Sequence, residues 1–397
     1  MKHISRTVWV LSIISLLNDA ASDLLYPVLP IYLKTIGYSV VIIGVLEGIA
    51  ELVAGLTKGY FGHWSDHMAK RKPFVQFGYA LSALSKPMLA MFVYPAWIFL
   101  ARSMDKLGKG IRTGARDAIL SDEATPQTKG RVFGFHKSMD SMGAVIGPII
   151  ALLYLYKYPG DYVNLLLITA VPGILTVLTT FFIREKKHTP APETARRPTF
   201  SLISYWKKSP AAYKKLVVGL LIFTLFNSSD MFLLLKAKEA GLQDTGIIGV
   251  YIFFNIVYTL FAYPTGILAD RIGLKNVFII GLVLFALVYG SISFYTDLYF
   301  FAALFFLYGL FAACTDGISK AWITNIIDKK DTAKAIGSFS GFQSVAAFMA
   351  STLTGILWFS FGSVVAFLIT TLVTIGVIVY TIIAVPYHPV HTEQPPA

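Results

Sequence analysis

Residues 266–275 read GILADRIGLK, a short segment rich in glycine and charge at the end of a long apolar run. An earlier segment repeats its spacing, because Gly62 precedes Asp66 by four residues just as Gly266 precedes Asp270. The two copies lie 204 residues apart, from position 62 to position 266, and each follows the second apolar stretch of a series. This recurrence predicts two related halves within one chain.

The stretches around these segments have the length and composition of membrane spans. A helix crosses the hydrocarbon core with about 20 apolar residues. The 397-residue chain is 55% hydrophobic and only 14% charged, with a mean hydropathy of +0.65, whereas soluble domains carry about 25% charged residues. The sequence predicts an all-α polytopic membrane protein with twelve transmembrane helices in two six-helix bundles, at residues 7–33, 39–61, 74–94, 96–119, 132–156, 162–183, 216–238, 245–269, 276–296, 298–320, 333–358 and 362–384.

The basic residues indicate an orientation in the membrane. The net charge of +12 is carried by short tracts between apolar runs, which is typical of a membrane protein and argues against nucleic-acid binding. Even-numbered loops hold most of this charge, so we expect both termini to be cytoplasmic in an inner-membrane protein. We predict a bundle over 1–183, a basic cytoplasmic linker over 184–215, a bundle over 216–384 and a cytoplasmic tail over 385–397. The loop residues behind this expectation are Lys70, Arg71, Lys72, Arg271, Lys275, Lys329, Lys330 and Lys334.

Several chemistries are disfavoured by what the sequence lacks. The single cysteine, Cys314, excludes an internal disulfide, and no Cys/His cluster has metal-ligand spacing. No phosphate-binding G-x4-G-K-[S/T] loop, G-x-S-x-G or H-E-x-x-H motif occurs. We therefore expect no catalytic residues, no metal and no cofactor.

Acidic side chains occur inside the first, second and fifth predicted spans, in addition to the mixed charges of the fourth. Each costs on the order of 2.5–3.5 kcal/mol to insert near the bilayer centre, so such residues mark an ion or substrate path unless they only pair. Those in the first and second spans come in pairs four residues apart, which places each pair on one helix face. We predict proton coupling through these acids, which are Asp19, Asp23, Glu47, Glu51 and Asp140.

The fourth span carries a basic stripe at helical spacing, formed by Arg102, Lys106, Lys109, Arg112 and Arg116. Two interpretations stay open. In the first, the acids and bases only pair and lock the bundle. In the second, spare positive charge binds an anionic substrate. Under the second interpretation the predicted substrate-binding residues are Arg102, Lys106, Lys109, Arg112, Tyr26, Asn227, Asp230, Tyr251, Asn255, Tyr258 and Gln343.

Residues 266–275 resemble the loop signature of the major facilitator superfamily, G-x3-D-R-x-G-x-K. The first copy departs from it at His67 and Ala69. The fifth span contains Gly134-x8-Gly143-x3-Gly147-Pro148, which is similar to the motif of proton-coupled antiporters in that family, although Ala151-Leu152 replaces its usual Gly-Gly end. The resemblance implies a two-bundle fold and gating roles for Asp66, Arg71, Asp270, Arg271, Gly143, Gly147 and Pro148.

Together these features predict a proton-coupled secondary transporter of a small organic solute, working by alternating access as a monomer among membrane lipids. Export by solute:proton exchange is favoured by the glycine motif, and uptake of an organic anion or chelator by proton symport is the alternative. The substrate could be an anionic metabolite or a lipophilic drug. A membrane enzyme and a transporter-derived sensor are both disfavoured, because no catalytic motif and no added soluble domain are visible.

Overall fold

The computed structural model describes residues 4–68, 70–123, 129–185, 202–292, 298–327 and 332–385, and all regular secondary structure in them is α-helical. Helices are the expected solution for apolar segments in lipid, because a helix satisfies its backbone hydrogen bonds internally. The first half of the chain contains α1 (Arg6–Leu25), α2 (Leu29–Thr35), α3 (Val40–His67), α4 (Lys72–Met88), α5 (Pro95–Asp122), α6 (Lys129–Lys157), α7 (Tyr162–Ile168) and α8 (Ala170–Thr180).

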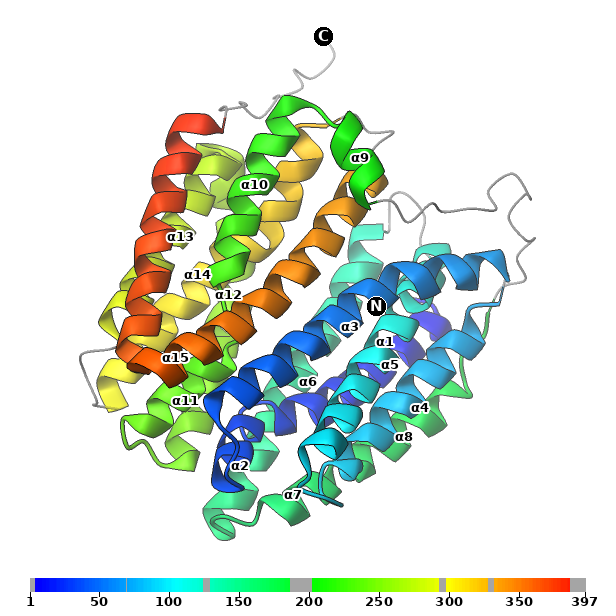
Figure 1. Cartoon of the computed structure of the whole chain (residues 1–397). Coiled ribbons are helices and arrows are strands. Elements are labelled where there is room, and N and C mark those ends of the chain that lie inside the picture. Colours follow the sequence, from blue (N-terminus) through cyan, green and yellow to red (C-terminus); the bar gives the residue numbers. More distant parts are fainter. Residues whose placement is uncertain are drawn as a thin grey trace.

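The second half repeats this pattern after a short helix, α9 (Leu202–Lys208). Figure 1 shows the helices of the two halves as two bundles lying side by side. We call the end of the molecule where α8 ends and α10 begins the linker side, and the opposite end the far side. The helices of the second half are α10 (Ala211–Phe226), α11 (Met231–Glu239), α12 (Asp244–Ile272), α13 (Leu274–Ser291), α14 (Leu298–Asn325) and α15 (Thr332–Ala384).

A helix lies at each of the predicted spans. In the described part of the chain, nine helical stretches are long and apolar enough to cross a membrane, and the last of them contains both final spans. Those two are separated at Gly362, whose φ of 85° interrupts the helical conformation inside α15. The third and fourth spans fall outside these nine, because α4 has only 17 residues and α5 carries the basic stripe.

In the described part of the chain, three spans that the apolar pattern presents as continuous are divided between two helices. The sixth is divided between α7 and α8 at Thr169, where the backbone dihedral angles stay in the helical region. The first is divided between α1 and α2 by the turn at residues 26–28, which contains Pro27. The seventh is divided between α10 and α11 at Asn227, where the backbone leaves the helical region (φ −87°, ψ 86°). Interrupted helices within a membrane expose polar backbone groups, which transporters use at substrate and ion sites.

The two halves contact each other along α3 and the first part of α15, which run beside one another in Figure 1. The contact is close because glycines face it. A Cβ on Gly48 would lie 2.7 Å from the carbonyl oxygen of Phe348, and a Cβ on Gly355 would lie 2.9 Å from that of Val40. These contacts extend from the far side to Gly55, which meets Ser344.

The end of the predicted linker is more ordered than the sequence suggested. We expected a solvated segment over 184–215, yet α9 is helical and α10 already begins at Ala211. The reason is aromatic packing, because the ring of Trp206 lies 6.3 Å from that of Tyr213 and 5.8 Å from that of Phe342. At the other end of the segment, Glu185 accepts hydrogen bonds from the first backbone amides of α4. Residues 186–201 and 386–397, which hold half of the predicted linker and nearly all of the predicted tail, lie outside the described residues.

Candidate functional site

A cavity of about 680 Å³ lies between the two halves, a volume that suits a drug-sized organic molecule. Its lining belongs almost entirely to the second half, and within the described residues the first half adds only Glu51 and Lys137. It extends from the break between α10 and α11 toward the linker side. Seven aromatic side chains line it: Phe223, Phe254, Tyr258, Phe278, Tyr308, Phe311 and Phe339.

The break between α10 and α11 places polar groups at the inner end of this cavity. Asp230, which precedes α11, accepts a hydrogen bond from the Tyr308 hydroxyl at 2.5 Å. The backbone N–H of Ser229 donates to Oγ of Ser351 at 3.3 Å, so the break is held against α15. The side-chain oxygen of Asn227 is buried and accepts no hydrogen bond within the described part of the chain. The cavity thus offers a carboxylate and a free amide oxygen to a solute.

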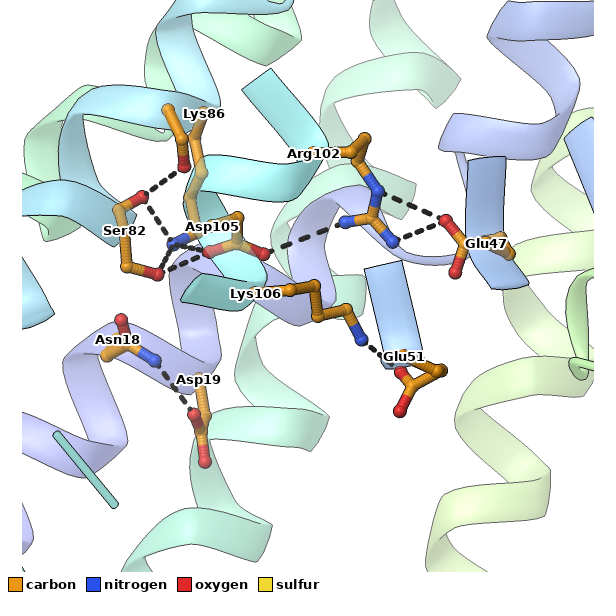
Figure 2. A network of polar contacts seen from close by, with 10 residues as sticks. Asn18, Asp19, Glu47, Glu51, Ser82, Lys86, Arg102, Asp105 and Lys106 are labelled. Atoms are coloured by element: carbon orange, nitrogen blue, oxygen red, sulfur yellow. Dashed lines mark hydrogen bonds and ion pairs between the residues drawn. The ribbon is translucent and has the colours of Figure 1, made fainter. Parts of the chain in front are cut away.

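Beside the cavity, the first half contains a chain of ion pairs, which Figure 2 shows from Lys86 to Glu47. Arg102 donates through Nε to Glu47 Oε1 at 3.1 Å and through a terminal nitrogen to the same oxygen. Its other terminal nitrogen lies 3.7 Å from Asp105, which lies 3.4 Å from Nζ of Lys86. Ser82 joins the same group by donating to Asp105. Because Lys86 and Glu47 are only 2% and 1% exposed, this group is buried and internally neutralised.

A second pair, Lys106 with Glu51, lies one turn farther along both helices. It differs from the first in accessibility, because the Glu51 side chain is 46% exposed whereas that of Lys106 is 10% exposed. Glu51 also lines the cavity. This pair therefore connects the charged network of the first half with the space between the halves.

The acids of α1 have different surroundings from those of α3. Asp19 accepts a hydrogen bond from the amide of Asn18 at 3.0 Å. Asp23 makes no hydrogen bond or ion pair with any described residue, although it lies in the middle of the first span. Asp140 of α6 accepts from Ser15 and lies 3.9 Å from Lys137. The structure thus contains a partly accessible carboxylate in the membrane with no fixed partner.

The glycines of the fifth span hold α6 against the helix that carries these acids. A Cβ on Gly143 would lie 2.5 Å from the carbonyl oxygen of Leu16 and 3.1 Å from Cβ of Asp19. A Cβ on Gly147 would lie 2.6 Å from the backbone nitrogen of Leu24. Larger residues would separate the helices, so these positions need glycine because of the close approach itself. Pro148, directly after, lies inside α6.

Comparison with known proteins identifies the family. The model of the Major Facilitator Superfamily matches residues 11–254 and 237–397. An uncharacterized MFS-type transporter from Methanocaldococcus jannaschii is 33% identical over 378 residues, which cover 92% of this chain and 93% of that protein. The chain belongs to the Major Facilitator Superfamily. It is accordingly an integral membrane transporter, and the predicted fold class is confirmed.

Two further relatives are more distant. A multidrug resistance protein, MdtH, from Yersinia enterocolitica is 28% identical over 142 residues, which cover 35% of each protein. The crystal structure of the nucleoside transporter NupG superposes with a TM-score of 0.79 at 16% identity, over 97% of this chain and 100% of that one. At 16% identity, the similarity to NupG supports the superfamily fold alone.

The predicted substrate-binding residues fall into two groups in this superfamily fold. Four line the cavity, namely Asn227, Asp230, Tyr258 and Gln343. The others lie away from its described lining. Tyr26 and Tyr251 stack on each other with ring centroids 5.4 Å apart, and Asn255 donates to the Tyr251 carbonyl oxygen.

The basic stripe of α5 is also divided. Arg102 and Lys106 have carboxylate partners, and Arg116 pairs with the adjacent Asp117 at 3.0 Å. The guanidinium of Arg112 stacks over the ring of Tyr79 at 4.5 Å, and two of its nitrogens are buried without a hydrogen-bond partner among the described residues. Lys109 is exposed and makes no ion pair with any of them. The stripe is therefore one continuous series in sequence and several separate environments in space.

The predicted gating residues are only partly described. The side chains of Asp66 and Asp270 lie outside what the structure describes. Arg71 forms an ion pair with Asp122 at the end of α5, and Arg271 is exposed in the last turn of α12. Among the described residues no group of three or more potential ligands could hold a metal ion.

Sequence reasoning missed three residues of the site. Lys86, Ser82 and Tyr308 complete the polar contacts around Asp105 and Asp230. Lys86 could have been identified from the sequence, since it is a lone lysine inside an apolar span. Tyr308 could not have been identified in this way, because it is one of 21 tyrosines and only the fold places it next to Asp230.

Proposed function

We propose that this protein is a proton-coupled exporter, which exchanges a small organic solute for protons across the cytoplasmic membrane by alternating access. Both termini are cytoplasmic in this proposal, so the linker side faces the cytoplasm. One chain contains the whole cavity, and the proposal needs only a monomer. No catalytic residue has a role in it.

The observation that carries the proposal is the environment of Asp23. An acid inside the membrane without a fixed partner can take up and release a proton without breaking an ion pair, which is what a coupling group needs. Asp23 meets this condition, whereas Glu47 is bound by Arg102 and Glu51 by Lys106. We propose Asp23 as the main proton carrier and Asp19, Glu51 and Asp140 as its neighbours in the coupling path. Glu47 belongs to the same set by sequence, but its ion pair with Arg102 gives it mainly a structural role.

The arrangement of the halves supports alternating access. The contact between α3 and α15 closes the space on the far side, and the cavity extends from it toward the linker side. Solute would enter from the cytoplasm in this state, as an exporter requires. The change to the state that is open on the far side would separate Gly48 from Phe348 and bring the linker-side ends of the halves together.

The solute would lie among the aromatic side chains of the second half, in contact with Asn227, Asp230, Tyr258 and Gln343. An anionic group on it would find Lys137 and Lys320 at the cavity, and Lys109 of α5 makes no ion pair with any described residue. Arg102 and Lys106 are less suited to this task because their charges are already neutralised.

Export is supported by the glycine motif of α6 and by the partial similarity to a multidrug resistance protein. A second candidate is proton symport for uptake of an organic anion or chelator. It is favoured by one specific observation, the replacement of the motif's final Gly-Gly by Ala151-Leu152.

The coupling assignment is tested in proteoliposomes with Asp23→Asn, Asp19→Asn and Glu51→Gln. We expect Asp23→Asn to abolish solute flux driven by a proton gradient while solute exchange at equal pH continues. Its melting temperature should match that of the wild type, because no partner is lost. Glu239→Gln, far from the cavity, is the control and should keep coupled flux. Wild-type proton-driven flux in all three variants would refute the assignment.

A further inference from the structure

A second cavity, of about 480 Å³, lies beside the central one, and residues of α12, α14 and the start of α13 line it. No charged side chain is among its described lining residues. Many of these residues are small or aliphatic, such as Ala262, Ile267, Ala313 and Ala321. We call this space the side groove.

The side groove has an exposed apolar rim. Tyr263 and Ile267 on this rim are 78% and 39% exposed, and both belong to the apolar span Asp244–Ala269. Apolar surface is more stable in contact with apolar groups than with water. The groove therefore suits the apolar part of a solute.

The side groove also borders the central cavity. Tyr258 and Gly317 line both spaces, one from α12 and one from α14. A Cβ on Gly317 would meet nothing within 4 Å, so the main chain of α14 has open space beside it at this border. A molecule with two chemically different parts could occupy both spaces at once by passing between these residues.

Charges of both signs lie on the central side of this border. Asp316 and Lys320 are one helical turn apart on α14, both exposed, and neither makes an ion pair with another described residue. Lys137, which is 68% exposed, lines the same cavity from the first half. Groups that can bind an anion and a cation thus stand directly beside the apolar groove.

We propose that the transported solute is a single-chain amphiphile with a zwitterionic head. The head lies in the central cavity between Asp316 and the two lysines, and the apolar chain passes Tyr258 into the side groove. This inference rests on the proposed transport function and names the class of its substrate. A bilayer lipid resting in the groove is the competing occupant, and the experiment separates the two.

The test measures binding of alkylphosphocholines with 4, 8, 12 and 16 carbons to the purified full chain in nanodiscs, with empty nanodiscs subtracted. Phosphocholine alone is the head-only probe. Complete burial of a methylene group corresponds to about fourfold in affinity, so partial burial still gives a steep dependence on chain length. We expect affinity to rise at least tenfold from 4 to 12 carbons in the wild type.

Two variants fill the groove, Ala262→Phe and Gly266→Leu, at positions that line the groove and not the central cavity. Both should flatten the dependence on chain length while phosphocholine binding changes less than threefold. Gly249→Leu is the matched control, because its position on α12 also has open space but lies outside both cavities. It should retain the wild-type dependence. Equal affinity for all chain lengths, or a dependence that both groove-filling variants leave unchanged, would overturn the proposal and leave the groove to bilayer lipid. Binding is measured without a proton gradient, so a failure of proton coupling would not affect this result.

Discussion

The guanidinium of Arg102 donates two hydrogen bonds to one oxygen of Glu47, and this pair ties α5 to α3 inside the first half. Both side chains are almost fully buried, at 10% and 2% exposure. A buried ion pair is costly to break because the remaining charge loses its partner. The pair therefore gives Glu47 a structural role, whereas the sequence alone could not distinguish structural pairing from proton transfer.

The first prediction concerns this pair. Glu47→Ala leaves the Arg102 guanidinium buried without its main partner and should destabilise the protein by about 3–5 kcal/mol. The measurement is thermal unfolding of the purified protein in detergent. Glu239→Ala is the control, because Glu239 is 48% exposed. It loses an ion pair with Lys236, worth about 0–1 kcal/mol, and a hydrogen bond from Ser363, worth about 0.5–1.5 kcal/mol.

The double variant Glu47→Leu/Arg102→Met refines this prediction. It removes both charges together, and it should recover most of the stability lost in Glu47→Ala. If the pair is structural, the double variant also keeps proton-coupled flux. Stability restored without coupled flux would instead assign Glu47 a direct part in proton transfer.

The second prediction concerns the glycines of α6. Gly143→Ala and Gly147→Ala place a methyl group against the backbone of α1, so each should cost about 1–3 kcal/mol and reduce transport. Gly249→Ala meets open space, and replacing a helical glycine there should leave stability unchanged or raise it by up to about 1 kcal/mol. Thermal unfolding compares the three. Equal stability of all three would show that α6 does not depend on this close approach.

The third prediction concerns the contact between α3 and α15. A Cβ on Gly355 would lie 3.1 Å from Cα of Val41, so the two positions face each other across the contact. Cysteines placed there reach disulfide distance once the helices shift apart by a few tenths of an ångström. Oxidised Val41→Cys/Gly355→Cys should therefore lose transport, and a reductant should restore it. Each single-cysteine variant, with Cys314 buried in both, controls for the oxidant. Full transport with a formed disulfide would mean that this contact need not open.

The fourth prediction concerns Tyr308. Tyr308→Phe removes the hydrogen bond that holds Asp230 in place at the cavity. Ordering a freed side chain on binding costs about 0.5–1.5 kcal/mol, so solute affinity should fall about twofold to tenfold. Tyr289→Phe is a matched control, since its buried hydroxyl has no hydrogen-bond partner among the described residues. Equilibrium binding of a transported compound measures both. Unchanged affinity in Tyr308→Phe would remove Asp230 from the binding site.

Much of the fold could be predicted from the sequence because lipid imposes simple rules. The apolar spans, the repeated Gly62 and Gly266 segments and the basic loops are all local patterns. The interruptions at Pro27 and Asn227 were not predicted, since counting apolar residues does not reveal where a backbone leaves the helix. The run from Asn227 to Asp230 was the available signal, as four polar residues in mid-span suit a break better than a helix.

The candidate site was predicted less completely, for a physical reason. Asn227, Asp230, Tyr258 and Gln343 stand out as polar residues in apolar helices, and all four line the cavity. Which charges pair depends on distances between helices that no sequence spacing contains. Of the five acids predicted for proton coupling, only Glu47 and Glu51 form ion pairs with described residues of the basic stripe.

The most direct test of the central claim is made in proteoliposomes that contain the purified protein and a trapped pH dye. Polycarboxylates, chelators, lipophilic cations and alkylphosphocholines are added outside in turn, with protein-free vesicles and Asp23→Asn as controls for buffering and passive entry. Proton-coupled exchange predicts that the lumen becomes more alkaline as a transported compound enters, and that Asp23→Asn abolishes this change. Acidification of the lumen on entry would contradict exchange and show that the protein is a symporter.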